Sequence, residues 1–347
     1  MNKKKQIRVL IADDSALMRI LINDIINTDP DIDVVGQVNN GKSAYVSTEE
    51  LKPDVVLMDV NMGEYDGIYG VIEIMKHCPT PIIILSSIGN VDMDPILEGL
   101  KLGAIDYLNK PAKNRVNMDE VKQDLIKKIK VASTINLEEV LKNPITSNIH
   151  EHSFDKFISY DCIVLGASTG GPRALERILT RLPKNLTIPV VIAQHMPASF
   201  MAAFASRLDQ LTPLQVSIAE QGAKLIAGNV YLAPGDINLT IERKKGSYVF
   251  AVTEEQFVAY NNPSIDALML SVAKTYKKRA IGVVLSGMGK DGAIGLKAMK
   301  AAGSYTIAQS EASCIVYGMP KAAVEMEAVK QVVHLDEIAA FLVSCLA

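Results

Sequence analysis

Ser168 stands in a sequence context that could support nucleophilic chemistry. It follows the apolar run 162-CIVLGA-167 and lies between glycines in 166-GASTGG-171. The pattern G-x-S-x-G between a strand and a helix is typical of a nucleophile elbow, a strained turn that presents a serine hydroxyl. The first amide N–H groups of the following helix would then face an oxyanion. A Ser168 that only caps this helix fits the same residues about as well.

A glycine loop that binds phosphate at a helix N-terminus is a further alternative for this segment. The spacing here is G-x-x-x-G-G, whereas a dinucleotide fingerprint requires G-x-G-x-x-G. No acidic residue ends a following strand at the place where a ribose would need it. The sequence therefore disfavours a dinucleotide site.

A nucleophilic serine needs a base and an acid that orients the base. Toward the C-terminus from Ser168 the only histidines are His195, which ends the apolar run 189-PVVIAQ-194, and His334. Asp291 follows another apolar run in a glycine-rich loop. The chain order Ser168, Asp291, His334 is that of an α/β-hydrolase, and Ser168 with His195 and Asp291 is the other possible triad. Triads are defined by geometry and not by order, so these residues alone leave both open.

A second set of polar residues follows apolar runs in the N-terminal third of the chain. These residues are Asp13, Asp14, Asp59, Ser86 and Lys110, each at the end of a predicted strand. In an open α/β sheet such ends meet at one rim, where three carboxylates repel one another unless a hard cation lies between them. One such Asp could be a helix N-cap, but the whole set indicates an Mg²⁺ site beside a lysine and a hydroxyl.

The elements that must position these residues follow a repeating strand and helix pattern. Five apolar runs between Ile7 and Lys110 alternate with helix-length segments, which predicts a five-stranded parallel, doubly wound α/β domain. Six further runs between Tyr160 and Gln309 predict a second doubly wound α/β domain. Within it, the turns in 229–252 predict an inserted β-meander.

Three segments are expected along the chain. Residues 1–112 form the first domain, 113–157 a linker and 158–347 the second domain. The linker begins with an amphipathic helical pattern that carries Val121, Leu125 and Ile129 on one stripe. Its lysines are interpreted as a solvated helix face.

Composition excludes several classes of function. The chain has 347 residues and a net charge of −3, so no overall field attracts nucleic acid. No apolar run approaches the roughly 20 residues that span a bilayer, and the N-terminal run is too short for a signal peptide. The four cysteines form no CxxC pair and predict buried free thiols. We therefore expect a cytoplasmic protein that is not inserted in a membrane.

Residues 5–112 resemble a response-regulator receiver domain. The resemblance implies an Mg²⁺-dependent phosphoacceptor site with these members: Asp59 as phosphoacceptor, Asp13 and Asp14 as further metal ligands, Ser86 as switch hydroxyl, Lys110 as phosphoryl contact and Tyr107 as rotating aromatic. The family usually reads D-x-x-M-P-x-M-D-G after the phosphoacceptor strand, whereas this chain reads 59-DVNMGEYDG-67. Because Gly63 replaces a proline, we expect a more flexible loop.

The second domain resembles the catalytic domain of the chemotaxis protein-glutamate methylesterases. The segments that carry the resemblance are 166-GASTGGPRAL-175, 194-QHMPASFMAAFASRLD-209, 229-NVYLAPGD-236, 263-PSIDALMLSVA-273, 285-LSGMGKDGAIGL-296 and 308-AQSEASCIVYGMPKAA-323. It implies Ser168 as nucleophile, His195 as general base and Asp291 as its orienting acid. It also implies oxyanion donors at Met288 and Gly289, with Thr169 as a further one. The family commonly has His at Asn238 and Arg at Asn262, which leaves substrate preference less defined than reaction type.

Together the two resemblances imply a phosphorylation-activated hydrolase. It would remove methyl groups from glutamate γ-methyl esters of methyl-accepting chemoreceptors and deamidate receptor glutamines, with no cofactor in the esterase chemistry. A chemotaxis histidine kinase would be the phosphodonor, and phosphorylation would shift a closed arrangement of the domains toward an open one. The alternatives are an α/β-hydrolase acting on small esters and a phosphorylation-controlled adaptor without turnover.

Overall fold

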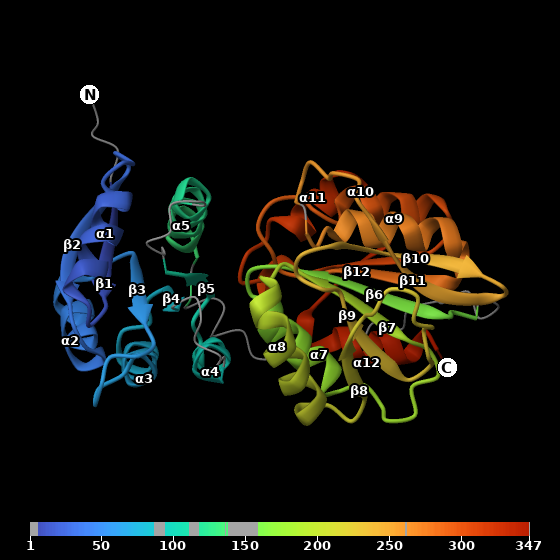
Figure 1. Ribbon diagram of the computed structural model, residues 1–347, viewed down its shortest axis with the longest axis horizontal. Helices are drawn as coiled ribbons and strands as arrows, with labels where there is room; N and C mark the ends of the chain where they lie inside the picture. Colours follow the sequence, from blue (N-terminus) through green and yellow to red (C-terminus); the bar gives the residue numbers. More distant parts are fainter. Residues whose placement is uncertain are drawn as a thin grey trace. The chain divides into compact units, whose positions relative to one another are not determined.

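A computed structural model describes residues 6–86, 94–110, 118–135, 137, 159–260 and 262–346. The chain divides into two compact units, Met1–Leu141 and Lys142–Ala347. Each unit is built on its own parallel sheet (Figure 1).

The first unit contains five strands and five helices among its described residues. In chain order they are β1 (Ile7–Ala12), α1 (Ala16–Ile26), β2 (Ile32–Val38), α2 (Gly41–Leu51), β3 (Val55–Asp59), α3 (Gly67–His77), β4 (Ile82–Ser86), α4 (Asp94–Leu102), β5 (Asp106–Asn109) and α5 (Met118–Ala132). The strand order is β2-β1-β3-β4-β5, and all neighbours pair in parallel. This confirms the predicted five-stranded parallel sheet, and every residue of β3 and β4 is buried, as strands covered on both faces require.

Helix α5 lies within the segment predicted as a linker, yet it packs on the first unit. It contacts α1, β4 and β5, and Leu125 and Ile129 on its predicted apolar stripe are fully buried. Lys128 anchors it further, because its Nζ lies 2.8 Å from Asp106 Oδ2. An amphipathic stripe indicates that a helix will pack, but not which domain it packs on. Residues 138–157 of the predicted linker lie outside the described residues.

The second unit is built on a seven-stranded sheet. Its elements are β6 (Cys162–Ala167), α7 (Gly171–Leu179), β7 (Val190–Gln194), α8 (Ala198–Leu211), β8 (Gln215–Ile218), β9 (Asn229–Leu232), β10 (Asn238–Lys244), β11 (Ser247–Thr253), α9 (Ile265–Thr275), β12 (Ala280–Val284), α10 (Ala293–Ala301), β13 (Tyr305–Gln309), α11 (Met319–Glu325), β14 (Gln331–Val333) and α12 (Leu335–Ser344), with short 3₁₀ turns at Lys277–Arg279 and Glu311–Ser313. The order is β14-β13-β12-β6-β7-β9-β8, with every pair parallel.

Helices cover both faces of this sheet, as a doubly wound fold requires. Helices α9, α10 and α11 lie on one face, and α7, α8 and α12 lie on the other (Figure 1). Strands β6, β7 and β12 are buried at every position. Their carboxyl ends therefore lie at the centre of one edge, where a doubly wound fold carries its site.

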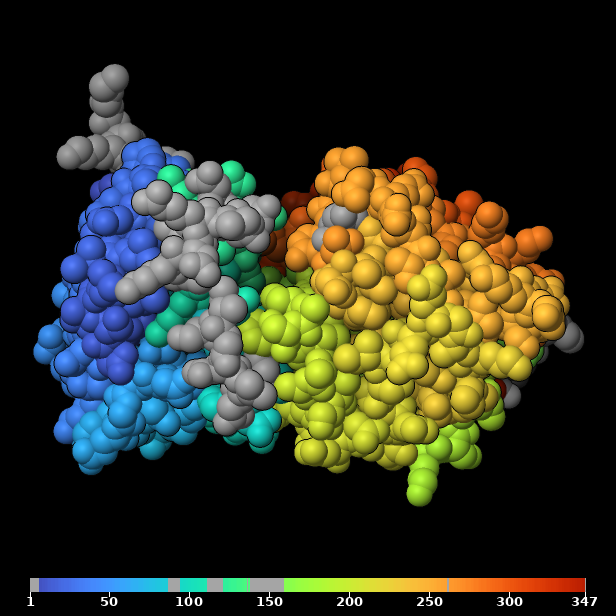
Figure 2. Space-filling view, in the orientation of Figure 1, coloured from blue at the N-terminus to red at the C-terminus, as the bar shows by residue number. Residues whose placement is uncertain are grey.

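The inserted segment differs from the predicted meander. Strand β9 pairs in parallel with β7 and β8 in the main sheet, and only β10 and β11 pair antiparallel, as a separate two-stranded sheet. Their hairpin turns at Lys245 and Gly246, both with positive φ (50° and 83°). The yellow to orange segment that includes this hairpin lies on an outer face of the second unit (Figure 2). Alternating residues indicate a strand but do not specify its partner, so the prediction of a meander over 229–252 is wrong.

Candidate active site

Ser168 lies directly beyond β6, and the turn around it is held by backbone contacts. Its N–H donates to Ser286 O at 3.1 Å, and its own carbonyl accepts from Gly171 N at 2.7 Å. The N-cap of α7 is Gly170, which makes no side-chain cap, so Ser168 does not have the capping role considered above. The positive φ of this turn, 78°, belongs to Gly170 and not to Ser168. The serine is therefore presented without the left-handed strain expected of a nucleophile elbow.

The register of β6 and β7 brings His195 beside Ser168. Ala167 pairs with Gln194, the last residue of β7, and His195 N donates to Ala167 O at 3.0 Å. Both strands therefore end at the same level of the sheet. The residue after each end projects from the same rim, because parallel neighbours in register terminate together.

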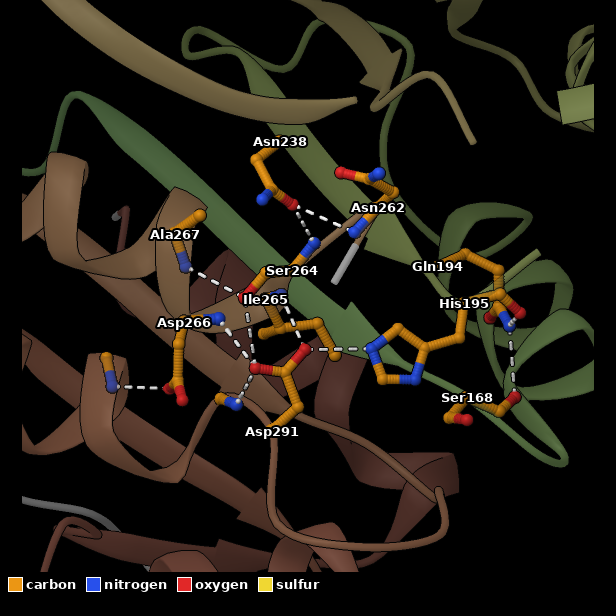
Figure 3. Close-up of polar contacts among 12 residues, drawn as sticks. Ser168, Gln194, His195, Asn238, Asn262, Ser264, Ile265, Asp266, Ala267 and Asp291 are labelled. Atoms are coloured by element: carbon orange, nitrogen blue, oxygen red, sulfur yellow. Dashed lines mark hydrogen bonds and ion pairs between the residues drawn. The ribbon is translucent and has the colours of Figure 1, made fainter. Parts of the chain in front are cut away.

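His195 faces Asp291 at the centre of this rim. Its Nε2 lies 2.8 Å from Asp291 Oδ2, and the two side chains are 5% and 1% exposed. The other ring nitrogen points toward Ser168 (Figure 3). The three residues predicted as a triad thus lie in one row, with the imidazole between the hydroxyl and the carboxylate.

The carboxylate of Asp291 is held by the N-terminus of α9. Oδ2 accepts from Ile265 N at 2.7 Å, and Oδ1 accepts from Asp266 N at 3.0 Å and from Ser264 Oγ at 3.3 Å. Gly292 N donates to Oδ1 at 3.0 Å. Amides at a helix start favour a negative charge, so this arrangement holds an ionised carboxylate in one orientation against His195.

Asp266 is a second buried acid beside Asp291. Its Oδ1 accepts from Gly295 N at 2.7 Å, and its side chain is 3% exposed. Burial, opposed by this hydrogen bond and reinforced by the charge of Asp291, raises the pKa of Asp266 to about 6. Asp266 therefore loses its proton less readily than an exposed aspartate.

His334 lies away from this row. It is the N-cap of α12, where its Nδ1 accepts from Asp336 N at 3.3 Å. Strands β12 and β13 separate its strand, β14, from β6. The structure therefore brings Asp291 to His195, and His334 has a capping role.

The loop after β12 lies against Ser168. A Cβ placed on Gly287 would be 2.7 Å from the Ser168 Cβ, so only a glycine permits this approach. Gly287 N donates to Val316 O at 3.0 Å. Within the described part of the chain, the amides of Met288 and Gly289 donate no hydrogen bond. Thr169, the residue after Ser168, is buried, and its carbonyl accepts from Ser286 Oγ at 2.8 Å.

Three residues of this site were not singled out from the sequence. Tyr260 stacks on the imidazole of His195, with ring centroids 3.6 Å apart and planes 14° apart. Gln194 donates to the backbone of both Ser168 and His195, and Ser286 joins Thr169 to Val316. Gln194 ends β7 and Ser286 follows the end of β12 by two residues, and this position beside the predicted catalytic residues is a signal that could have found them. Tyr260 lies in a loop without any motif.

The carboxylates of the first unit meet around a lysine. Lys110 Nζ lies 2.7 Å from Asp13 Oδ2 and 2.7 Å from Asp59 Oδ2, and all three side chains are nearly fully buried. Asp14 is exposed, and one oxygen from each of Asp13, Asp14 and Asp59 lies within 4.8 Å of the others. Burial raises the pKa of Asp59, which Lys110 opposes and Asp13 reinforces. Such a set of carboxylate oxygens could hold a hard divalent cation.

Ser86 and Tyr107 lie near this cluster on neighbouring strands. Ser86 ends β4, and its carbonyl accepts from Lys110 N at 2.6 Å. Tyr107 in β5 is 6% exposed, and Lys128 Nζ lies 5.6 Å from the centre of its ring. In the loop after Asp59, Gly63 has a φ of 75°, a conformation that proline cannot adopt.

Comparison with known proteins assigns both units. Residues 163–342 match the model of the CheB methylesterase family, and residues 9–122 match the response regulator receiver domain. The chain belongs to the CheB methylesterase family. The predicted resemblance is thereby confirmed for both parts of the chain.

Relatives of this methylesterase family match over nearly the whole chain. A protein-glutamate methylesterase/protein-glutamine glutaminase of Archaeoglobus fulgidus is 38% identical, over 96% of this chain and 96% of its own. One of Halalkalibacterium halodurans is 39% identical, over 97% of both. The crystal structure of the Thermotoga maritima CheB methylesterase catalytic domain has a TM-score of 0.52 and 37% identity, and it covers 54% of this chain and 99% of its own.

Asn238 and Asn262, the two departures from the methylesterase family pattern, are joined by a hydrogen bond. Asn238 is buried, and its Oδ1 accepts from Asn262 N at 3.0 Å and from Ser264 N at 2.8 Å. Its Nδ2 donates to Glu255 O at 3.1 Å. Asn238 therefore fixes the turn that leads into α9. A role in direct contact with a substrate does not fit its burial.

The described residues contain no helix that is both long and apolar enough to cross a bilayer.

Proposed function

We propose that this chain hydrolyses glutamate γ-methyl esters in methyl-accepting chemoreceptors, and that phosphorylation of Asp59 controls the rate. The observation that carries the proposal is the row formed by Ser168, His195 and Asp291, with the imidazole bonded to a carboxylate at 2.8 Å. The names of its relatives support the same substrate class and add glutamine deamidation. In this proposal the protein acts in the cytoplasm, is not inserted in a membrane and binds no nucleic acid.

Acyl transfer begins at Ser168. The ring nitrogen of His195 that faces the serine takes the Oγ proton while Oγ attacks the ester carbonyl carbon. The tetrahedral intermediate collapses, and methanol leaves with the proton that His195 returns to it. Water then loses a proton to His195 and attacks the acyl carbon, which releases the glutamate and regenerates Ser168. Asp291 holds the imidazole in the required tautomer and stabilises its charged form.

The oxyanion of each intermediate is assigned to backbone donors. The amides of Met288 and Gly289 lie in the loop beside Ser168 and are the first candidates, with Thr169 N–H as a further donor. Such preorganised donors stabilise charge that develops only in the transition state. The same geometry on a γ-amide releases ammonia in place of methanol, which is the deamidation reaction. No step of either reaction requires a cofactor.

The first unit is assigned as the phosphorylation switch. Asp13, Asp14 and Asp59 would hold Mg²⁺, and Lys110 would contact the phosphoryl oxygens. When bound, Mg²⁺ neutralises charge on the transferring phosphoryl group. Asp59 accepts the phosphoryl group from a chemotaxis histidine kinase. Ser86, at the end of β4 beside the strand of Asp59, and Tyr107, on the next strand β5, are assigned to sense the modification.

Methanol release from methylated receptor-containing membranes tests this proposal. The full chain is assayed with and without a small phosphodonor and Mg²⁺, beside a Ser168→Ala control. We expect release that rises with the phosphodonor and disappears in the control. If no methanol appears while Asp59 is shown to be phosphorylated, the substrate assignment is wrong.

A further inference from the structure

Gln194 connects the backbone on both sides of the candidate active site. It is the last residue of β7 and is 1% exposed. Its Nε2 donates to Ser168 O at 3.1 Å and to His195 O at 3.0 Å, as Figure 3 shows for the first of these contacts. A primary amide has two N–H groups, so these two carbonyls occupy both of them.

The orientation of this amide is determined by its partners. If nitrogen and oxygen were exchanged, Oε1 would face two carbonyl oxygens, and neither oxygen has a proton to donate. In the observed orientation, Oε1 is buried and accepts no hydrogen bond from a described residue. Burying an acceptor without a donor is unfavourable, so this arrangement is retained at a cost to stability.

The contact with Ser168 O fixes the peptide that contributes the Thr169 N–H. The carbonyl of this peptide accepts from Gly171 N at 2.7 Å as well as from Gln194. The peptide is trans, because the cis bond found among the described residues is Asn262–Pro263. In a trans peptide the C=O and N–H bonds point in opposite directions. Two donors on the carbonyl therefore hold the Thr169 N–H pointing away from the buried Gln194 side chain.

Gly171 provides the space that Gln194 occupies. A Cβ on Gly171 would lie 2.1 Å from Gln194 Oε1. Gly171 has no positive φ, so its backbone conformation alone does not demand a glycine. A Cβ here would also lie 2.8 Å from the Cβ of Ala167, so the absence of a side chain at this position is explained by the Gln194 amide together with Ala167.

We propose that Gln194 is a positioning residue that aims the Thr169 N–H at the acyl oxygen in the tetrahedral intermediate. Its second hydrogen bond, to His195 O, fixes the backbone of the base relative to the same turn. The inference rests on the proposed esterase function, because it requires Ser168 to be acylated. Gln194 touches no reacting atom and acts through the peptide that it holds.

Steady-state methanol release by the full chain tests this role. Gln194→Met keeps the length and volume of the side chain and removes both donors. Since an oxyanion donor acts only in the transition state, we expect kcat to fall by about 10- to 100-fold while KM changes by less than about threefold. Thr306→Val, a buried polar-to-apolar exchange in β13 outside the site, is the matched control and should keep the wild-type kcat.

A glutamate at this position separates positioning from packing. In Gln194→Glu, an ionised carboxylate would face two carbonyl oxygens, whereas the protonated form can donate to one of them. The kcat of Gln194→Glu, divided by that of Gln194→Met at the same pH, should therefore rise as the pH is lowered. A purely structural role predicts a ratio that does not depend on pH.

Gly171→Ala provides an independent route to the same defect, because it displaces the Gln194 amide. The double variant with Gln194→Met should lose no more activity than the more impaired single variant, as expected for two changes that remove one contact. If Gln194→Met fails to fold, Gly171→Ala alone still tests the inference, because a lower kcat would support it and a wild-type kcat would contradict it.

Three outcomes would overturn the inference. The first is a wild-type kcat in either folded single variant, the second is a loss confined to KM, and the third is a ratio of the Gln194→Glu and Gln194→Met kcat values that does not depend on pH. A Ser168→Ala chain as active as the wild type would instead reject the proposed function itself, so the two failures are distinguishable.

Discussion

Single side chains decide which histidine can act as the base. The carboxylate of Asp291 faces His195 at 2.8 Å, while His334 caps a helix at the edge of the sheet. We predict that His195→Ala abolishes methanol release, with a loss of about 10⁴-fold or more in kcat. His334→Ala should retain wild-type kcat and lose only the cap, which costs about 1 kcal/mol. If kinetics and thermal unfolding showed instead that His334→Ala abolishes activity while His195→Ala spares it, the triad would be Ser168, Asp291 and His334, in the chain order of an α/β-hydrolase.

A second prediction at this scale concerns the buried acid Asp266. Its folded-state pKa of about 6 lies above the ordinary value of 3.8, so the native state binds more protons than the unfolded state between these values. The stabilisation from this group is complete below the unfolded pKa and is lost as pH rises through about 6. Asp266→Asn keeps the acceptor for Gly295 N and removes the charge.

Calorimetry of Asp266→Asn tests this reasoning. At pH 8 the variant should unfold at a midpoint higher by about 2–4 °C, equivalent to about 1 kcal/mol for a unit of this size. The difference should shrink toward pH 5, where the native aspartate is itself protonated. A difference that does not change with pH would show that the charge of Asp266 is not the cause.

Among the larger elements, the loop between β3 and α3 adopts a conformation that a proline could not. Gly63 has a φ of 75°, and no atom lies within 4 Å of a Cβ built on it. Gly63→Pro should therefore destabilise the receiver unit rather than stiffen its loop. Gly63→Ala should cost about 1–2 kcal/mol, because only the left-handed backbone penalises it. Denaturant unfolding of both variants checks this, and a stabilised Gly63→Pro would contradict it.

The turn that leads into α9 depends on Asn238. Removing its side chain would leave the amides of Asn262 and Ser264 without their acceptor, at a cost of about 1–3 kcal/mol. We predict that Asn238→Ala lowers the thermal midpoint of the methylesterase unit and also lowers kcat, because Ser264 and Ile265 hold Asp291. If Asn238→Ala is destabilised but keeps the wild-type kcat, the turn that Asn238 holds does not contribute to catalysis and this prediction is wrong.

The sequence predicted which segments form strands and helices better than it predicted which strands pair with one another. Apolar runs and helix-length spacing were sufficient for the two parallel sheets, because burial on both faces leaves a continuous apolar signal. They were not sufficient for β8, whose short, partly exposed sequence resembles a loop, or for the pairing of β9. The residues around Ser168 were predicted from motif and resemblance. The contacts of Gln194 and Tyr260 depend on how strand ends and loops meet in space, which no local pattern records.

Considered as a whole, the molecule joins a candidate phosphoacceptor site to a candidate esterase site in one chain. We predict that Asp59→Asn abolishes the increase in methanol release caused by a small phosphodonor and leaves basal release within about twofold of wild type. The reason is that Asn keeps the shape of the side chain but cannot accept the phosphoryl group. Persistent stimulation in this variant would show that the control does not pass through Asp59.

The hairpin of β10 and β11 has a practical consequence for work on the protein. Its tip at Lys245 and Gly246 is exposed, and it belongs to a two-stranded sheet outside the catalytic one. Exposed tips of this kind tolerate inserted residues, because the added backbone remains hydrated. A single residue inserted into β7 would instead turn His195 to the opposite face of its strand. The hairpin tip is therefore the position at which we would introduce a peptide tag or a fluorophore.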